Sequence, residues 1–347
     1  MLYAFELSGE HTTLPRAEVL ACLEIMGLEY TEHTFLDQCL LVDVAGSEYL
    51  IEKKIVSVAK RLAMSHQILK VIGICDIDAD RIVGMVEGSD VSDYIKNGET
   101  YAVRAKRVKH HTTINSALLE RKVGGCIYRK GYHANLKKPN VEFRLLLTEK
   151  CVFGTVVAEV DRSAFEARAP HRKPFFYPGV LMPRVALALV NMSKVKEGEI
   201  LFDPFCGTAG ILVEAGLVGA EVIGLDVQPK IISGARMNLE GFDFKHSLLV
   251  GDACRLPLVD GCLNAIVTDP PYGRSATIRA ESLQHLYAIS FIEMYRVLKK
   301  GGFAVVVSEK PVEEFARNAG FLVFDEHLQK VHRSLTRIIS VFMKGVE

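Results

Sequence analysis

Hydrophobic and polar positions follow a regular pattern in the C-terminal part of the chain. Short apolar runs typical of buried strands occur at 198–205, 220–227, 246–252, 264–271 and 303–310. Amphipathic stretches, which predict helices, lie at 208–219, 229–242, 277–299 and 312–320. Strands that alternate with helices indicate βαβ units around a parallel sheet buried on both faces. The last run, 321–344, predicts two successive strands with no helix between them, hence an antiparallel edge.

The N-terminal part mixes strands and helices without this alternation. Apolar spacing and turn residues predict strands at 2–7, 39–46 and 101–108, a hairpin at 141–162, and helices at 15–26, within 51–66 and at 113–130. These elements form two α+β units. We therefore expect an α/β chain with domains at 1–65, 66–160 and 184–347 and a linker at 161–183.

The composition is that of an ordinary globular protein. Of the 347 residues 49% are hydrophobic and 24% are charged, which excludes a disordered or collagen-like chain. No apolar run approaches the ~18–20 residues of a membrane span, and the first residues lack a basic region and an apolar core. We expect a cytoplasmic protein. Eight cysteines are spread without a CxxC pair, so we expect free thiols and no metal site.

The formal net charge is zero, but the charges are not evenly distributed. Residues 101–150 hold 12 Lys and Arg against three acidic residues. Such segregation favours a local surface that binds a polyanion such as a nucleic acid. A solvated surface is the alternative. The side chains expected to contact phosphates are Lys106, Arg107, Lys109, Arg121, Lys122, Arg129, Lys137 and Lys138.

Acidic residues follow three successive strands of the predicted parallel sheet. The first strand leads into DPFCGTAG at 203–210, where glycines allow a sharp turn into a helix and close approach of a ligand. The second ends in Asp226, which is placed to accept hydrogen bonds from ribose hydroxyls, and the third in Asp252, within reach of an adenine amino group. Each aspartate alone has the alternative role of a helix cap. Together with the glycine-rich turn they predict a nucleoside-binding site.

The fourth strand ends in TDPPYGR, residues 268–274. Two successive prolines fix the backbone and remove two amide donors, so we expect the Asp269 carboxylate and the Pro270 carbonyl to be presented as acceptors. Two acceptors suit a substrate NH2 group. Tyr272 offers a flat face on which a base can stack. A proline-rich turn with a core tyrosine is the alternative.

The order DPFCGTAG, GLDV, GDA, DPPYG resembles the S-adenosylmethionine-dependent methyltransferases that modify exocyclic amino groups of bases. The segment RKPFFYPGVLMPRVALALVNMS is similar to an upstream motif of the same class. With an N-terminal region that resembles a ferredoxin-like domain (1–65) and a THUMP domain (66–160), the whole chain resembles the archaeal tRNA guanine-10 N2-methyltransferase family. The resemblance implies a Rossmann-like sheet, S-adenosylmethionine as cofactor and tRNA as partner.

The resemblance also implies roles for particular residues. Asp269, Pro270, Pro271 and Tyr272 would hold the guanine amino nitrogen. The cofactor would be bound by Asp203, Phe205, Cys206, Gly207, Thr208, Gly210, Asp226, Val227, Asp252 and Ala253, with Tyr177 and Pro178 closing its pocket. Hydrogen bonds to Asp269 and Pro270 would localise the nitrogen lone pair, and positioning would supply most of the rate.

Three other interpretations stay open at the level of sequence. The same chemistry can act on guanine at another tRNA position or in ribosomal RNA, and relatives of that kind more often have Asn at the place of Asp269. A DNA adenine methyltransferase uses a similar tetrapeptide but usually brings a DNA-recognition domain. A catalytically silent RNA-binding subunit would have a degraded motif. We expect a monomer, and the sequence leaves open mono- against dimethylation and the need for a small activating partner.

Overall fold

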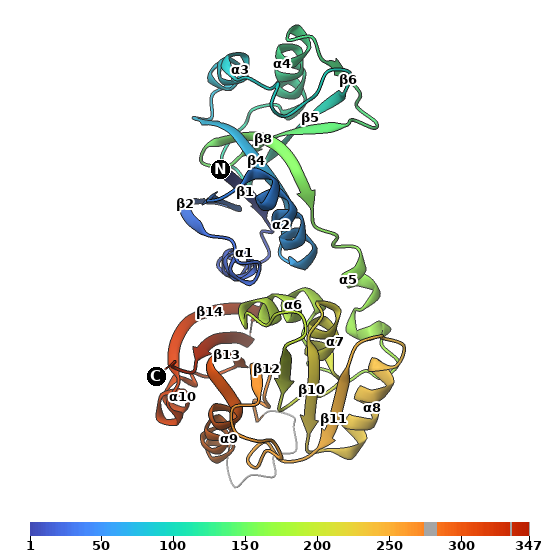
Figure 1. Ribbon diagram of the computed structural model, residues 1–347, viewed down its shortest axis with the longest axis vertical. Helices are drawn as coiled ribbons and strands as arrows, with labels where there is room; N and C mark the ends of the chain where they lie inside the picture. Colours follow the sequence, from blue (N-terminus) through green and yellow to red (C-terminus); the bar gives the residue numbers. More distant parts are fainter. Residues whose placement is uncertain (274–282, 334, 347) are drawn as a thin grey trace. The chain divides into compact units, whose positions relative to one another are not determined.

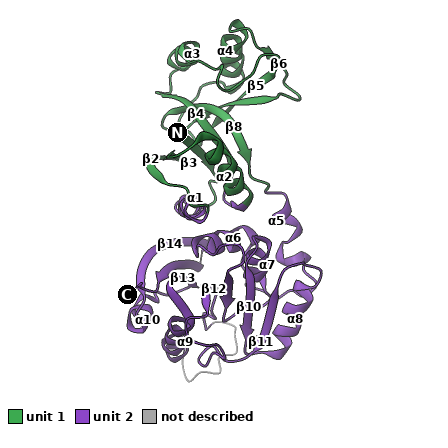
Figure 2. Cartoon of the chain, in the orientation of Figure 1, with its two compact units in different colours: residues 1–10, 26–60, 65–161 green, residues 11–25, 61–64, 162–347 purple. Residues whose placement is uncertain are grey.

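A computed structural model describes residues 1–273, 283–333 and 335–346. The chain forms two compact units (Figure 2). Unit 1 contains residues 1–10, 26–60 and 65–161, and unit 2 contains residues 11–25, 61–64 and 162–347. Unit 2 therefore takes two short segments from the N-terminal part of the chain as well as the whole C-terminal part.

Unit 1 is built on one eight-stranded mixed sheet with the order β2-β3-β1-β4-β8-β7-β5-β6 (Figure 1). The strands are β1 (Leu2–Leu7), β2 (Tyr30–Leu36), β3 (Cys39–Val44), β4 (Ser65–Cys75), β5 (Thr100–Arg107), β6 (His133–Ala134), β7 (Val141–Leu147) and β8 (Cys151–Glu159). The long strand β4 pairs with β1 on one side and with β8 on the other. One continuous sheet thus spans the two predicted N-terminal domains, and their division at residue 65 stays a prediction.

Three helices belong to this part of the chain: α2 (Glu48–Arg61), α3 (Ala79–Gly88) and α4 (Ser116–Arg129). Helix α3 was not expected from the sequence pattern; the Asp78 side chain caps it by accepting from the amides of Asp80 and Arg81. The buried residues Ile82 and Val123 bring α3 and α4 into one core with Phe143 of the sheet.

Unit 2 contains a seven-stranded sheet with the order β11-β10-β9-β12-β13-β15-β14. Its strands are β9 (Ile200–Asp203), β10 (Glu221–Asp226), β11 (His246–Val250), β12 (Leu263–Thr268), β13 (Leu298–Ser308), β14 (Leu322–His332) and β15 (Leu335–Met343). Strands β9 to β13 are parallel, whereas β15 runs antiparallel to both β13 and β14. The Rossmann-like sheet with an antiparallel end, predicted from the sequence, is confirmed.

Both faces of this sheet are buried by helices. The helices of unit 2 are α1 (Leu14–Ile25), α5 (Ala164–Ala167), η1 (Pro170–Arg172), α6 (Pro183–Met192), α7 (Gly210–Leu217), α8 (Pro229–Leu239), α9 (Leu283–Val297) and α10 (Glu313–Ala319). Val267 and Val305 pack with α6, α7 and α8 on one face, and their neighbours Ile266 and Val306 pack with α9 and α10 on the other. This burial explains why the strands are continuous apolar runs.

The predicted helix at 277–299 corresponds to α9 from Leu283 onward, and its first residues lie outside the described part of the chain. All eight cysteines are free thiols. None of the helices among the described residues is long and apolar enough to cross a membrane.

Candidate active site

The carboxyl ends of β9, β10, β11 and β12 meet at one edge of the unit 2 sheet and border a cavity of about 260 Å³. Parallel strands bring their ends to the same edge, so residues far apart in the sequence become neighbours there. All twelve predicted cofactor-binding residues line this cavity, together with Asp269 and Pro271 of the predicted catalytic turn. Pro270 and Tyr272 are not among the residues that line it.

The turn after β9 owes its shape to two residues with positive φ. Gly207 has a φ of 50° and Ala209 a φ of 64°, in the left-handed region of backbone conformation that residues other than glycine rarely adopt. The chain therefore reverses within a few residues and enters α7 at Gly210. A side chain at Gly224 on β10 would place its Cβ 2.5 Å from Leu212 Cδ1, so this glycine lets α7 pack directly on the sheet.

Asp203, the last residue of β9, is a buried acid at the bottom of the site. Only 1% of the residue is exposed, and its Oδ1 accepts hydrogen bonds from Thr268 Oγ1 at 2.6 Å and from the Phe205 amide at 3.0 Å. Burial raises the pKa of Asp203 to about 7, and the nearby carboxylates of Asp269 and Asp226 add to this rise. Folding has therefore placed several acidic groups close together at the cavity.

Asp226 and Asp252, at the ends of β10 and β11, each bind the backbone two residues farther on. Asp226 Oδ1 accepts from the Gln228 amide at 2.9 Å, and Asp252 Oδ1 accepts from the Cys254 amide at 2.9 Å. These bonds close Asx-type turns and are not helix caps, because α8 begins after Gln228, whose side chain forms no cap hydrogen bond, and the described residues between β11 and β12 form no helix. Both residues also line the cavity, so these turn hydrogen bonds and ligand binding are compatible here. Burial raises the pKa of Asp226.

The segment before α6 is attached to the glycine-rich turn by a residue that the sequence analysis missed. Asn238 of α8 is buried; its Oδ1 accepts from the Phe175 amide at 2.9 Å, and its Nδ2 donates to the carbonyls of Phe175 at 2.8 Å and Thr208 at 3.0 Å. This contact places Tyr177 and Pro178 on the wall of the cavity. Tyr177 is 48% exposed, which fits a side chain at the cavity mouth.

In the turn after β12, the Asp269 carboxylate is not an unsatisfied acceptor as expected from the sequence, because it already accepts one hydrogen bond. The Tyr272 hydroxyl donates to Asp269 Oδ1, and the Tyr287 hydroxyl donates to the Pro271 carbonyl at 3.0 Å. Tyr272 therefore orients the carboxylate, and its partly buried ring packs against the hydrophobic core of unit 2, as in the alternative of a core tyrosine. Stacking of a base on Tyr272 stays a prediction. Burial raises the pKa of Asp269 to about 6, against the lowering effects of Arg337 and Tyr272. Arg274, the last residue of the motif, lies outside the described residues.

The cavity suits a cationic ligand that carries a nucleoside. Asp203, Asp226 and Asp269 all line this cavity, and burial raises the pKa of each. A positive charge placed among them would favour their ionised forms. S-adenosylmethionine has a sulfonium and an ammonium group next to its nucleoside, so the residues present fit it.

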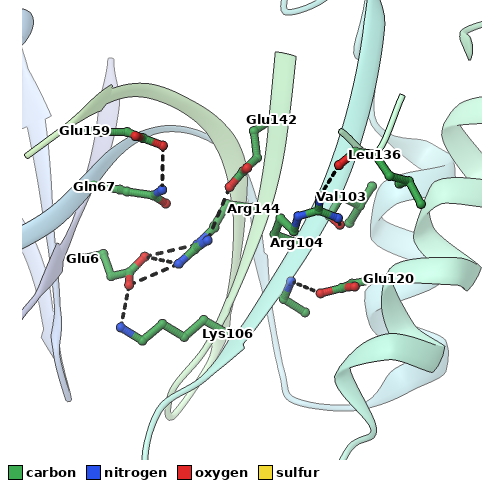
Figure 3. A network of polar contacts seen from close by, with 11 residues as sticks. Glu6, Gln67, Val103, Arg104, Lys106, Glu120, Leu136, Glu142, Arg144 and Glu159 are labelled. Atoms are coloured by element: carbon green, nitrogen blue, oxygen red, sulfur yellow. Dashed lines mark hydrogen bonds and ion pairs between the residues drawn. The ribbon is translucent and has the colours of Figure 1, made fainter. Parts of the chain in front are cut away.

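The predicted phosphate-binding residues lie in unit 1, on β5 and just after it, on α4 and after β6. Lys106 and Arg144 both contact the Glu6 carboxylate (Figure 3). The distance from Lys106 Nζ to Glu6 Oε1 is 2.6 Å, and Glu6 is 1% exposed. Lys106 therefore neutralises a buried acid of the sheet. Three others have ion-pair partners as well: Lys109 with Asp37, Lys122 with Asp80, and Arg129 with Glu87.

The remaining four, Arg107, Arg121, Lys137 and Lys138, are exposed and form no ion pair with a described residue. Asn135 shapes the loop of the two lysines, since its Oδ1 accepts from the amides of Lys137 at 3.2 Å and Lys138 at 3.1 Å. Arg104 holds the same loop through the Leu136 carbonyl at 2.7 Å (Figure 3). These four side chains, which have no ion-pair partner among the described residues, are the ones most available to a polyanion.

Two family models match the chain, one in unit 1, which holds the predicted phosphate-binding residues, and one in unit 2, which holds the candidate active site. The THUMP domain model matches residues 77–156, and the RMKL-like methyltransferase domain model matches residues 170–339. The protein is therefore a THUMP-containing methyltransferase that uses S-adenosylmethionine, as the sequence resemblance implies.

Curated relatives identify the family within this class. A tRNA (guanine(10)-N2)-dimethyltransferase of Methanothermobacter thermautotrophicus is 33% identical over 338 residues, 96% of this chain and 97% of that protein. One of Pyrococcus abyssi is 33% identical over 340 residues, 97% of this chain and 98% of that protein. The chain belongs to the tRNA (guanine(10)-N2)-dimethyltransferase family. In fold it is similar to TrmN from Thermus thermophilus, with a TM-score of 0.54 and 19% identity over 99% of this chain and 100% of that one.

We predict that Asp203→Asn stabilises the cofactor-free protein in a pH-dependent way. A folded-state pKa of about 7, above the ordinary 3.8, means that the stability contributed by the protonated carboxyl is present below about pH 4 and is lost as the pH rises through 7. Asparagine keeps the Oδ1 acceptor that Thr268 and Phe205 use and has no charge. Its advantage in free energy of unfolding should therefore grow by on the order of 2 kcal/mol between pH 5 and pH 8.

Denaturant melts of the two proteins at both pH values measure this growth. Asp93→Asn, at an exposed position of unit 1, is the matched control and should show no comparable growth. An equal difference at pH 5 and pH 8 for Asp203→Asn would show that its charge is not the cause.

Proposed function

We propose that this protein methylates the N2 amino group of guanine 10 in tRNA and adds a second methyl group to the same nitrogen. The observation that carries the proposal is the position of Asp269, which borders the same cavity as the nucleoside-binding acids Asp226 and Asp252. A hydrogen-bond acceptor at this place directs an amino group toward the cofactor site. The reaction and the RNA position are those in the names of the archaeal relatives.

The residues of the turn after β12 prepare the amino nitrogen for attack. S-adenosylmethionine supplies an electrophilic methyl group when it is bound. The guanine amino lone pair is delocalised into the ring, and hydrogen bonds from the N–H groups to Asp269 and the Pro270 carbonyl localise it. With a pKa of about 6, Asp269 is mostly a carboxylate at neutral pH and is therefore an acceptor. The Tyr272 hydroxyl fixes the direction of this carboxylate.

The base has to leave its stack to reach Asp269, at a cost of a few kcal/mol. A catalytic site that contacts one base has no means of choosing its place in an RNA. We assign that choice to unit 1, where Arg107, Arg121, Lys137 and Lys138 are free to contact phosphates. Phosphate contacts of this kind set the register of the RNA, and the identity of the base is read separately.

The test is to incubate the protein with unfractionated tRNA and labelled S-adenosylmethionine and to map the labelled nucleoside. We expect N2-methylguanosine and N2,N2-dimethylguanosine at position 10. A tRNA transcript with adenosine at position 10 is the matched control and should receive no label. Label at another guanine, in ribosomal RNA or in DNA only would replace this assignment, and no label at all would favour a silent RNA-binding role.

We predict that Asp226→Ala weakens cofactor binding by roughly 1–3 kcal/mol, the usual effect of losing charged hydrogen bonds. The variant loses the acceptor for the ribose hydroxyls and also the bond to the Gln228 amide. Asp226→Asn separates these effects, because it keeps one acceptor for Gln228 and lacks the charge. Calorimetry with S-adenosylhomocysteine should place Asn between wild type and Ala. Equal affinities of wild type and Asp226→Ala would remove Asp226 from the cofactor site.

A further inference from the structure

Arg337 reaches the candidate active site from a strand that the sequence motifs do not mark. Strand β15 runs antiparallel to β13, so its first residues lie at the edge where the parallel strands end. Arg337 is the third residue of β15 and is 8% exposed. Its Nη2 lies 3.9 Å from Asp269 Oδ2 and donates to the Gly179 carbonyl at 3.2 Å. The guanidinium thus contacts both the turn after β12 and the segment before α6.

This arrangement is a poor one for stability alone. An arginine that stabilises a buried carboxylate usually forms two short parallel hydrogen bonds. Here the approach to Asp269 is long, and Arg337 Nε is buried without a hydrogen-bond partner among the described residues. Burial of a cation with incomplete pairing costs free energy. The positive charge at this place is therefore better explained by an effect on the residues beside it.

We propose that Arg337 is a positioning residue for the methylation reaction: it keeps Asp269 in its ionised, hydrogen-bond-accepting form and ties the turn after β12 to the Gly179 segment of the cofactor cavity. The inference rests on the proposed function of Asp269 and extends it to a residue outside every sequence motif. Arg337 does not line the cavity, and so acts through Asp269 and Gly179.

The other groups around Asp269 would not hold its charge without Arg337. Tyr272 on the same turn and Tyr287 of α9 present neutral hydroxyls, because burial and the Asp269 charge raise the pKa values of both. Asp203 of β9 is acidic and repels a second negative charge, and Glu309, after β13, interacts with Tyr287. Arg337 is the cation that acts on Asp269 among the described residues. Its removal would favour a proton on Asp269, and a protonated oxygen becomes a donor.

The first experiment is a pH profile of single-turnover methylation, with saturating tRNA and cofactor, for wild type, Arg337→Gln and Arg337→Lys. An opposite charge nearby shifts a carboxyl pKa by about 1–3 units. We expect the acid limb of Arg337→Gln to move up by about one to two units, with a rate about two- to tenfold lower at pH 7 and recovered near pH 9. Arg337→Lys should retain the wild-type limb. A uniformly lower rate with an unmoved limb would overturn the proposal.

The second experiment does not depend on activity. Arg337→Gln is made in the wild-type and in the Asp269→Asn backgrounds, and the melting temperatures of the four proteins are compared at pH 8. If Arg337 acts on the charge of Asp269, its loss changes the melting temperature less favourably in the wild-type background than in the Asp269→Asn background, where there is no carboxylate charge to hold. Equal changes in both backgrounds would overturn the proposal, whatever the enzyme methylates. An absence of methyl transfer to tRNA by the wild-type protein would count against the proposed function instead.

Discussion

Asp269→Ala lowers the single-turnover rate of tRNA methylation by about two orders of magnitude or more, the scale of removing a positioned electrostatic group. In the proposed function the Asp269 carboxylate accepts a hydrogen bond that strengthens as the amino nitrogen becomes pyramidal, so the loss of rate should persist at saturating cofactor and tRNA. The measurement is methyl transfer under single-turnover conditions with calorimetry of cofactor binding on the same samples. A rate near that of wild type would remove this turn from the chemistry.

Asp269→Asn is the matched control, because asparagine keeps one carbonyl acceptor and loses the charge. We expect a rate well above that of Asp269→Ala. If Asp269 had to accept the proton released from the nitrogen, asparagine would be as inactive as alanine. The pKa of about 6 adds a condition on the wild-type enzyme: its rate should fall as the pH drops through 6 and the carboxylate becomes protonated. Thermal melts of both variants establish that they are folded.

A variant with reversed charge at the four exposed cations that have no ion pair with a described residue binds tRNA about 100-fold or more weaker at low salt. It combines the substitutions Arg107→Glu, Arg121→Glu, Lys137→Glu and Lys138→Glu. Each phosphate contact contributes about 0.7–0.9 to the slope of log affinity against log salt, so the slope should become shallower by about two to four. Anisotropy titrations at several salt concentrations measure both quantities. Cofactor affinity should stay unchanged, since all residues that line the candidate cofactor cavity belong to unit 2.

The control for this variant carries the same change in charge at other exposed lysines: Lys53→Glu, Lys60→Glu, Lys96→Glu and Lys196→Glu. If binding reflects only net charge, the two variants lose affinity equally, and the predicted phosphate-binding surface is wrong. Lys106 is left out of the test. Its ammonium neutralises the buried Glu6 carboxylate, so a reversal there would damage the sheet of unit 1 and confuse stability with binding.

The sequence was sufficient to predict that the candidate cofactor-binding residues lie close together, because the positions of these residues follow from a local rule. DPFCGTAG, Asp226, Asp252 and Asp269 each end a strand of a parallel sheet, and all such ends share one edge. Buried strands are recognised as continuous apolar runs and amphipathic helices by their period, which is why β9 to β13 and their helices could be predicted. Helix α3 has only a short apolar stretch, and its cap at Asp78 became evident with the structure.

Contacts between distant parts of the chain were decided by the tertiary structure. The identity of Arg337 says nothing of its neighbours; the reversed direction of β15 brings it to Asp269. In the same way, Asn238 binds the Phe175 backbone because α8 packs beside the turn at Thr208. Lys106 no longer belongs to the predicted phosphate-binding set, because β5 lies near Glu6 in one sheet and Lys106 pairs with that residue. Strand and helix patterns are properties of neighbouring residues, whereas the partner of a charged side chain depends on the packing of whole elements. For that reason the sequence determined the site motifs, and only the tertiary structure determined which side chains hold those motifs in place.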